Sequence, residues 1–324
     1  MNRRSFLLAT AVTAVTLAGC KPGPAAGAKP VLRFGHFPNI THVQGLVAHA
    51  LSRQGKGWYE SRLGVDVQWY TYNAGPSATE AIFARSLDVT YVGPSPTLNA
   101  YAKSKGTEMR VLAGAANGGS SLVVRPAANI HSPADFRGKK VATPQLGNTQ
   151  DVQARAWLSN QGFKITLTGG DVTILPTQNA DQLAMFAKGD IDAVWTAEPW
   201  VSRLELEAGG NVFLEDKDTN VTLLVSSAKF VKDQPDLAKK LVAAHKELTE
   251  WIKAHPAEAR ELIKSELKAE TNSEPKDAMI DKALPRVVLT DEISRSSLDT
   301  MVQSAQKAGF LKDIPDLTQL IPSL

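Results

Sequence analysis

The chain has 324 residues, of which 43% are apolar and 21% are charged. These proportions are typical of a soluble globular protein with room for one large domain or two ordinary ones. The net charge is +3, and subtracting the two charges of Arg3 and Arg4 leaves +1 for the rest of the chain. A nearly neutral body disfavours a nucleic-acid binder, and no run after residue 20 reaches the roughly 18 apolar residues of a membrane span.

The N-terminal segment predicts export. Residues 1–19 join a short basic start to an apolar run that is too short to span a bilayer, which is typical of a signal peptide. Arg3-Arg4 resembles a twin-arginine signal, and Leu17–Cys20 resembles a bacterial lipobox. We therefore expect Cys20, the only cysteine, to be lipidated, with an ordinary cleaved signal as the alternative. Residues 20–30 are rich in Pro, Gly and Ala and predict a flexible tether.

From residue 31 onward the chain alternates short apolar strands with amphipathic helices, which predicts an α/β fold with mostly parallel strands. The expected strands are Val31–Phe37, Val65–Asn73, Asp88–Gly93, Arg110–Ala115, Ser121–Arg125, Lys139–Thr143, Asp171–Thr177, Asp192–Ala197 and Thr222–Ser227. After residue 228 the pattern is almost entirely helical, with an apolar stripe along 236–255 that is typical of a core helix, and we expect these C-terminal helices to pack against the first of two lobes.

Polar residues mark the expected helix starts. Capping boxes are predicted at 41–44, 77–80 and 179–182, and caps at Ser95, at Glu198 and at Asn148 or Thr149. Ligands of open α/β sheets bind beyond the carboxyl ends of the strands. Several helix N-termini facing one cleft would form an anion site without Lys or Arg. Each cap alone could merely mark the start of its own helix, but several such junctions of one type favour a binding site.

Other constellations predict little chemistry. His36, His42 and His49 could suggest a metal, but no acid or cysteine completes the set in the sequence, so we expect no metal and no cofactor. No phosphate-binding glycine motif occurs, and we expect no catalytic residues. Glu198 lies between Trp195 and Trp200, which are either core aromatics or cleft walls around an acid.

Five motifs in the same order resemble the solute-binding lipoproteins of the nitrate, sulfonate and taurine ABC-transporter family, the aliphatic sulfonate-binding proteins among them. They are Phe34–His42, Asn73–Pro76, Val92–Pro96, Gly147–Asp151 and Gly189–Trp200, and the likeness covers roughly residues 31 to 320. The resemblance implies a type II periplasmic-binding-protein fold, in which two α/β lobes joined by two crossing segments enclose a ligand cleft.

The resemblance also implies how the chain is divided. We expect the crossings near Gly118–Leu122 and Leu224–Ser227. Lobe one would comprise residues 31–119 plus 228–324, and lobe two residues 120–227.

The resemblance further implies a site and a role. The expected ligand-binding residues are Asn39, His42, Gly75, Ser77, Ser95, Gly119, Thr149, Gln150 and Glu198. The solute would be a small organic anion, above all an aliphatic sulfonate, taurine or a nitrate-like solute, and Glu198 would suit the amino end of an amino-sulfonate. The protein would be a monomer, held to the membrane by lipid on Cys20. It would deliver its solute to an ABC permease and its ATPase, and it would not bind nucleic acid.

Three alternatives stay open. Within the same fold, the solute could be a pyrimidine vitamin precursor stacked on Trp and Tyr side chains. An enzyme of related fold would need catalytic His or Cys clusters inside the cell, which the export signal and the thiol-free mature body disfavour. A sensor lobe that presents its solute to a membrane kinase would have the same sequence features.

Overall fold

The computed structural model describes residues 29–313 and 316–324. The predicted signal peptide, the lipidation site Cys20 and residues 20–28 of the predicted tether lie outside the described residues. Within the described part of the chain, no helix is both long and apolar enough to cross a membrane.

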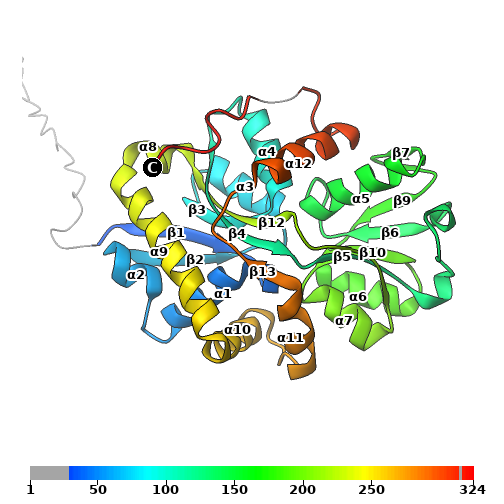
Figure 1. The fold of residues 1–324 in the computed structure, drawn as a ribbon, viewed down its shortest axis with the longest axis horizontal. Coiled ribbons are helices and arrows are strands. Elements are labelled where there is room, and N and C mark those ends of the chain that lie inside the picture. Colours follow the sequence, from blue (N-terminus) through cyan, green and yellow to red (C-terminus); the bar gives the residue numbers. More distant parts are fainter. Residues whose placement is uncertain (1–28, 314–315) are drawn as a thin grey trace, which may run out of the picture.

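A six-stranded mixed sheet forms the first lobe (Figure 1). Its strand order is β13 (Val287–Leu289), β4 (Met109–Gly118), β12 (Asn220–Ser227), β3 (Val89–Val92), β1 (Val31–His36) and β2 (Asp66–Thr71). The strand β1 runs parallel to β2 and β3, whereas β12 is antiparallel to β3 and β4. The reversal occurs where the chain returns from the second lobe, so the prediction of mostly parallel strands is wrong for this part of the sheet.

Helices cover both faces of the first sheet. One face packs against α1 (Val43–Arg53), α2 (Trp58–Leu63), α9 (Pro235–Ala254) and α10 (Pro256–Thr271), with α8 (Ala228–Asp233) at its margin. The other face packs against α3 (Gly75–Phe83), α4 (Pro94–Lys103) and α12 (Arg295–Lys307). The first lobe is therefore a three-layer α/β/α unit, and burial of the central strands β3 and β12 on both faces explains their continuous apolar sequences.

A five-stranded sheet forms the second lobe (Figure 1). Its order is β11 (Asn211–Asp216), β5 (Ser120–Val124), β10 (Ala193–Ala197), β6 (Lys140–Thr143) and β9 (Thr173–Pro176). The helix α5 (Thr149–Asn160) covers one face, and α6 (Asn179–Lys188) and α7 (Trp200–Ala208) cover the other. Again β5 runs antiparallel to both neighbours, while β6 is parallel to β9 and β10.

All nine predicted strands are present, and four further strands were not predicted. These are β11, β13 and the two-residue strands β7 (Ile165–Thr166) and β8 (Gly169–Gly170). The last three are too short to carry an alternating apolar pattern. The strand β11 is only half-buried along its length, so its sequence lacks the continuous apolar run of the central strands.

The chain passes between the sheets at two points. The first is Gly118–Gly119, where both residues have positive φ, 71° and 69°. A Cβ on Gly118 would lie 2.7 Å from the carbonyl oxygen of Arg286, so only glycine fits this close approach. The second passage is at 217–219. The predicted crossing at Leu224–Ser227 is wrong, because those residues lie within β12, a fully buried strand of the first sheet.

The prediction that the C-terminal helices pack against the first lobe is confirmed for only some of them. It is confirmed for α9, which contacts α2, and for α10, which contacts α1. By contrast α11 (Asp277–Ala283) contacts α7, and α12 contacts both α4 and α5. The apolar side of α12 shares a core with Val152 of α5. These two helices therefore bridge the lobes, and their amphipathic sequences alone could not show which partners they have.

Candidate functional site

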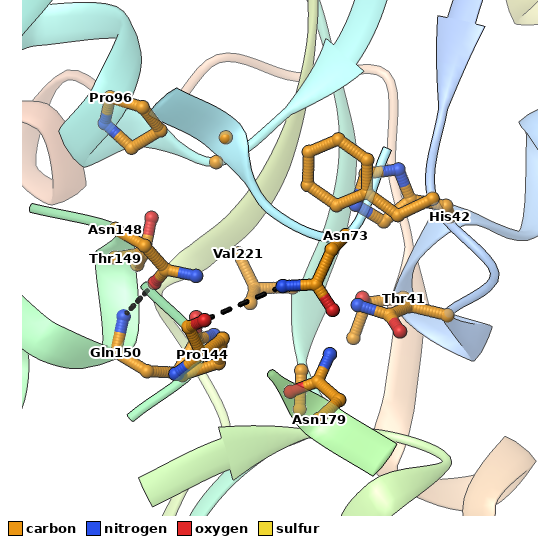
Figure 2. Close-up of a pocket in the computed structure, with 15 residues that line it drawn as sticks. Thr41, His42, Asn73, Pro96, Pro144, Asn148, Thr149, Gln150, Asn179 and Val221 are labelled. Carbon is orange, nitrogen blue, oxygen red and sulfur yellow. Dashed lines mark hydrogen bonds between the residues drawn. The ribbon is translucent and has the colours of Figure 1, made fainter. Parts of the chain in front are cut away.

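A small cavity lies where the carboxyl ends of strands from both sheets meet (Figure 2). Its volume is about 20 Å³, roughly the space of one water molecule. Its lining comprises Phe37, Asn39, Thr41, His42, Asn73, Gly75, Gly93, Pro96, Pro144, Asn148, Thr149, Gln150, Asn179, Ala197 and Val221. Most of these residues follow β1, β2, β3, β6 or β9 directly, where ligands of α/β sheets bind.

The start of α5 supplies the densest group of polar lining residues. Asn148 is the N-cap, and its side-chain oxygen accepts a hydrogen bond of 2.7 Å from the backbone N–H of Gln150. This confirms the predicted cap. Thr149 and Gln150 form the first turn and line the cavity. The positive end of this 12-residue helix thus faces the space between the lobes.

A buried ion pair fixes the loop before α5. The carboxylate of Asp151 accepts hydrogen bonds from the hydroxyl of Thr143 at 2.8 Å and from the N–H of Gly147 at 2.9 Å. Arg155, one turn later, donates to the same carboxylate at 3.0 Å, and both side chains are buried. This pair was not predicted from the sequence. The spacing of an acid and a base four residues apart was the available signal.

Glu198 does accept a hydrogen bond of 3.0 Å from the N–H of Ser202 in the first turn of α7, whereas the predicted caps of α1, α3, α4 and α6 are wrong. The helices α3 and α4 begin at Gly75 and Pro94, before Ser77 and Ser95, and each has a proline in its first two positions. Proline suits these positions because its ring presets the helical φ. A 3₁₀ turn at Ile40–His42 precedes α1, and Asn179 is the first residue of α6 rather than its cap.

The lining contains no Lys, Arg, Asp or Glu, so its polarity comes from amides, hydroxyls and one imidazole. His42 is buried and stacks on Phe37 with a ring-centre distance of 4.2 Å. Burial and the neighbouring His36 hold the pKa of His42 well below its usual value, so its ring is neutral at pH 7. Its Nδ1 has no hydrogen-bond partner among the described residues, which leaves one buried polar atom at the cavity wall.

Five of the nine predicted ligand-binding residues line the cavity, namely Asn39, His42, Gly75, Thr149 and Gln150. Gly75 has to be glycine there, since a Cβ would lie 2.2 Å from Cγ of Pro96.

Ser77, Ser95 and Gly119 do not line it. The hydroxyl of Ser77 hydrogen-bonds the side chain of Gln145 at 3.3 Å, and that of Ser95 donates to the carbonyl of Gly147 at 3.1 Å. These two serines therefore join the lobes. Gly119 lies at the first passage between the sheets.

Glu198 is not a cavity residue either. Its buried carboxylate pairs with Arg286 at 2.9 Å and accepts hydrogen bonds from the N–H and the hydroxyl of Ser202, both at 3.0 Å. Burial raises the pKa of Glu198, and the bond from Arg286 opposes the rise. The hypothesis that Glu198 accepts an amino group of the ligand is therefore not supported, because Arg286, 88 residues later in the chain, already occupies this carboxylate.

The flanking tryptophans are structural as well. The indole N–H of Trp195 donates to the hydroxyl of Ser120 at 3.2 Å, and that of Trp200 donates to the amide oxygen of Asn39 at 3.2 Å. The second bond reaches across the lobes and orients a lining residue. No Trp or Tyr is among the described residues that line the cavity.

Four other polar lining residues were not among the predicted ligand-binding residues. These are Thr41, Asn73, Asn148 and Asn179. Asn73 ends a predicted strand, and Asn148 and Asn179 lie in the junctions after two others, so their position at or beyond a strand end was the signal. Thr41 had been assigned a capping role only.

Three comparisons relate this fold to known proteins. The model of a family described as NMT1-like matches residues 25–266. A Bacillus subtilis (strain 168) protein, provisionally named an aliphatic sulfonates-binding protein, is 24% identical over 315 residues, 93% of this chain and 91% of that protein. The taurine-binding periplasmic protein of Escherichia coli (strain K12) is 25% identical over 192 residues, 57% of each chain.

Among solved structures, the alkanesulfonate-binding protein SsuA from Xanthomonas axonopodis pv. citri, bound to MOPS, superposes with a TM-score of 0.72. It is 18% identical and covers 91% of this chain and 99% of that chain. A likeness at this identity concerns the fold alone, and it confirms the predicted two-lobed binding-protein architecture.

Proposed function

The chain belongs to the NMT1-like family, and from that premise we propose that it is the solute-binding component of an ABC importer for a small organic anion. The observation that carries this proposal is the cavity between the lobes, whose polar groups come from both sheets and carry no formal charge. Aliphatic sulfonates are the first candidates, with taurine and nitrate-like solutes next.

Neutral donors suit a sulfonate for a physical reason. A sulfonate spreads one charge over three weakly basic oxygens, and the lining carries the side-chain amides of Asn39, Asn73, Asn148, Gln150 and Asn179, each with two N–H groups. One N–H of Asn73 donates to the carbonyl of Pro144 and one of Gln150 to the hydroxyl of Ser120, both at 3.4 Å. The N-terminus of α5 adds a positive partial charge. These donors do not titrate between pH 5 and 9, so the site can hold an anion over that whole range.

The absence of acidic side chains from the described lining refines the choice. An ammonium group, as in taurine, would be desolvated in the closed cavity without a carboxylate to pair with. We therefore favour an alkanesulfonate without an amino group over taurine. The pyrimidine alternative loses its main support, because the Trp and Tyr side chains that would have stacked a ring do not line the cavity.

A solute of this size needs the lobes to separate before it enters. The cavity of about 20 Å³ is smaller than a sulfonate, so the structure represents a closed arrangement. A solute that contacts both lobes stabilises the closed state more than the open one, and that difference drives capture.

The test is a binding screen of the purified mature chain by thermal shift and calorimetry. The panel contains ethanesulfonate, butanesulfonate, taurine, nitrate and an aminopyrimidine. We expect the melting temperature to rise with alkanesulfonate concentration. Replacing Thr149 with Val should weaken binding roughly 10- to 100-fold, the value of one hydrogen bond to a charged group.

The exposed Thr168→Val is the matched control and should bind normally. A melting-temperature rise with the aminopyrimidine alone, or equal affinity of the Thr149 and Thr168 variants, would contradict the proposal.

The proposal extends to location and partners. The lipobox-like Leu17–Cys20 supports a mature protein that is lipidated at Cys20, held at a membrane outside the cytoplasm, and works as a monomer with a permease and an ATPase. Mass spectrometry of the mature N-terminus tests the anchor. An unmodified N-terminus, or a Cys20→Ala chain that still fractionates with membranes, would contradict it.

A further inference from the structure

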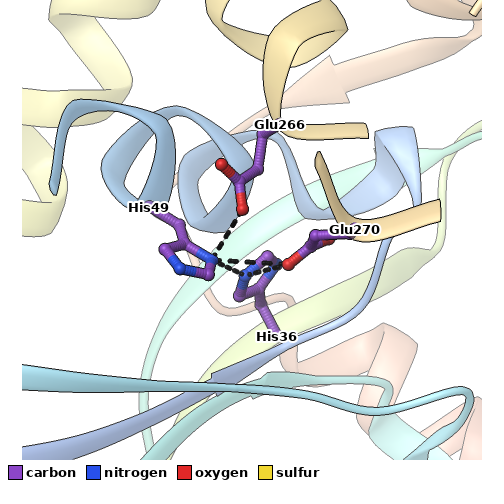
Figure 3. A group of neighbouring side chains, drawn as sticks. All are labelled: His36, His49, Glu266 and Glu270. Carbon is purple, nitrogen blue, oxygen red and sulfur yellow. Dashed lines mark hydrogen bonds and ion pairs between the residues drawn. The ribbon is translucent and has the colours of Figure 1, made fainter. Parts of the chain in front are cut away.

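Four buried side chains from distant parts of the sequence converge in the first lobe, outside the solute cavity (Figure 3). His36 ends β1, His49 lies on α1, and Glu266 and Glu270 are one turn apart on α10. One ligand atom from each, two imidazole nitrogens and two carboxylate oxygens, can be chosen so that all lie within 4.8 Å of one another. The acids that the three-histidine pattern lacked in the sequence are therefore supplied more than 200 residues later.

The spacing of these atoms is close to that of a four-coordinate metal site. Nε2 of His36 lies 3.0 Å from Nδ1 of His49 and 3.0 Å from Oε1 of Glu270. Nδ1 of His49 lies 2.8 Å from Oε1 of Glu266 and 3.4 Å from Oε1 of Glu270. A tetrahedral Zn²⁺ with bonds of about 2.0–2.2 Å places its ligand atoms roughly 3.3–3.5 Å apart. Small shifts of the side chains would reach this geometry.

The hydrogen-bond pattern leaves electron pairs facing one another. Nδ1 of His36 lies 3.3 Å from the carbonyl oxygen of Phe37, which can only accept, so this nitrogen carries the proton. The other ring nitrogen, Nε2, faces Nδ1 of His49 and a carboxylate oxygen of Glu270. A proton on one nitrogen can bridge only part of this cluster, whereas a single dication would satisfy all four groups.

The surroundings of the four side chains are also those of a metal site. The N–H of His36 toward the Phe37 carbonyl is the outer-shell bond that typically orients a ligating histidine. Thr71 donates to Glu270 at 2.7 Å, and Nε of Arg53 donates to both oxygens of Glu266. One carboxylate oxygen, Oε2 of Glu270, is buried without a partner among the described residues.

The charge balance favours a cation. Two buried carboxylates face one guanidinium, that of Arg53, so these three groups together carry one net negative charge beside the two imidazoles. Buried charge of this kind is unfavourable unless it is paired or coordinates a metal. His49 keeps 11% of its side chain exposed and Arg53 keeps 49%, which provides a path of entry from solvent.

We propose that His36, His49, Glu266 and Glu270 bind one structural Zn²⁺ that joins α10 to β1 and α1. Nitrogen and carboxylate ligands in a closed four-coordinate set suit this ion, whereas Ca²⁺ and Mg²⁺ require more oxygens. The site shares no side chain with the solute cavity, so the failure of either proposal would leave the other standing.

The test uses the purified mature chain without a histidine tag, stripped of metal with a chelator and dialysed. We expect the stripped protein to take up one Zn²⁺ per chain in calorimetry and to gain thermal stability, with no response to Mg²⁺ or Ca²⁺. His49→Gln and Glu270→Gln should each lose more Zn²⁺ affinity than the roughly 10–100-fold lost when a residue that only hydrogen-bonds a metal ligand is replaced. His131→Gln, an exposed histidine, is the control and should bind as the parent does.

Cobalt substitution makes the test independent of how the variants fold. Co²⁺ in a four-coordinate site gives intense visible absorption, and it should also quench Trp69, which stacks on His49 at a ring-centre distance of 4.9 Å. Three results would each overturn the proposal. These are no Zn²⁺ uptake by the stripped parent, equal uptake by the parent and both ligand variants, and a weak six-coordinate Co²⁺ spectrum.

Discussion

Glu198 connects the two lobes through charge rather than through the solute. Its carboxylate caps the N–H of Ser202 in α7 and pairs with Arg286, which also contacts Glu205 at 2.7 Å. The backbone of Glu198 takes part too, since its carbonyl accepts from the N–H of Ile40 and its N–H donates to the carbonyl of Gly119. This residue therefore stabilises the region where the chain passes between the sheets.

Replacing Glu198 with Gln should lower stability and leave solute affinity unchanged within about twofold. Removing one member of a buried ion pair costs about 3–5 kcal/mol when the other charge is left alone. Arg286 keeps Glu205, so we expect a smaller loss of about 2 kcal/mol in the free energy of unfolding. Urea unfolding and calorimetry with the solute would measure the two quantities. A large loss of affinity with unchanged stability would mean that the carboxylate meets the solute after all.

Single site residues could be predicted from the sequence where a local rule applies. Asn148 could be predicted as a cap because Asn is favoured at the N-cap of a helix. Thr149 and Gln150 follow it directly in the first turn of the same helix. Arg286 could not be predicted as the partner of Glu198, since no local pattern joins residues 88 positions apart. The acids of the proposed zinc site were missed for the same reason.

At the scale of elements, α9 is held to the first sheet by a buried hydrogen-bond chain. Nε2 of His245 lies 2.7 Å from the carbonyl of Gly114, which can only accept, so this nitrogen carries the proton. Nδ1 then accepts from the hydroxyl of Tyr91 at 2.9 Å, and Tyr91 accepts in turn from Tyr59 at 2.6 Å. This arrangement of donors and acceptors requires the imidazole of His245 to be neutral.

Acid should weaken this helix–sheet contact. Burial lowers the pKa of His245 from 6.5 to about 4. As pH falls, the unfolded chain takes up the proton first, so the stability present above about pH 6.5 is lost progressively between about pH 6.5 and pH 4. At pH 5 the loss from this one group is about 2 kcal/mol.

A His245→Gln variant should not show this part of the loss in unfolding free energy at low pH. The difference in unfolding free energy between the parent and this variant should narrow by about 2 kcal/mol from pH 7 to pH 5. The exposed His131→Gln should show no such change. If the difference for His245→Gln stayed constant with pH, the histidine would not be the group that titrates.

Element boundaries show where propensity was overruled. Ser77 and Ser95 have the side chains of good caps, yet the prolines beside them start α3 and α4 earlier. The three-residue strand β13 carries no periodic signal, and it exists because β4 offers it an edge. The central strands were predictable because each is buried on both faces and reads as an apolar run.

At the scale of the whole molecule, hydrogen bonds outside the cavity lining also hold the two lobes together. Ser77 with Gln145 and Ser95 with Gly147 are two such bonds. The two-lobed fold could be predicted from the order of strands and from the resemblance of its motifs. The second passage between the sheets could not, because β12 looks like any other apolar strand.

Removing one bond between the lobes should weaken capture of the solute indirectly. Ser77→Ala deletes a hydrogen bond of about 1 kcal/mol that exists only in the closed state. We expect about fivefold weaker solute binding, mainly through faster dissociation, although Ser77 does not line the cavity. Stopped-flow dissociation measures this, with the exposed Ser273→Ala as the control. Equal dissociation rates would mean that this bond does not favour closure.

The alternation of the chain between sheets has a consequence for biosynthesis. A ribosome that delivers the chain from its N-terminus completes the second sheet at Asp216, but the first sheet only when β13 emerges at Leu289. Until β12 is made, the strand β3 has an open edge toward its missing neighbour, and such an edge invites pairing with other chains. The lobe begun first is thus the one finished last, and its N-terminal strands wait longest for their partners.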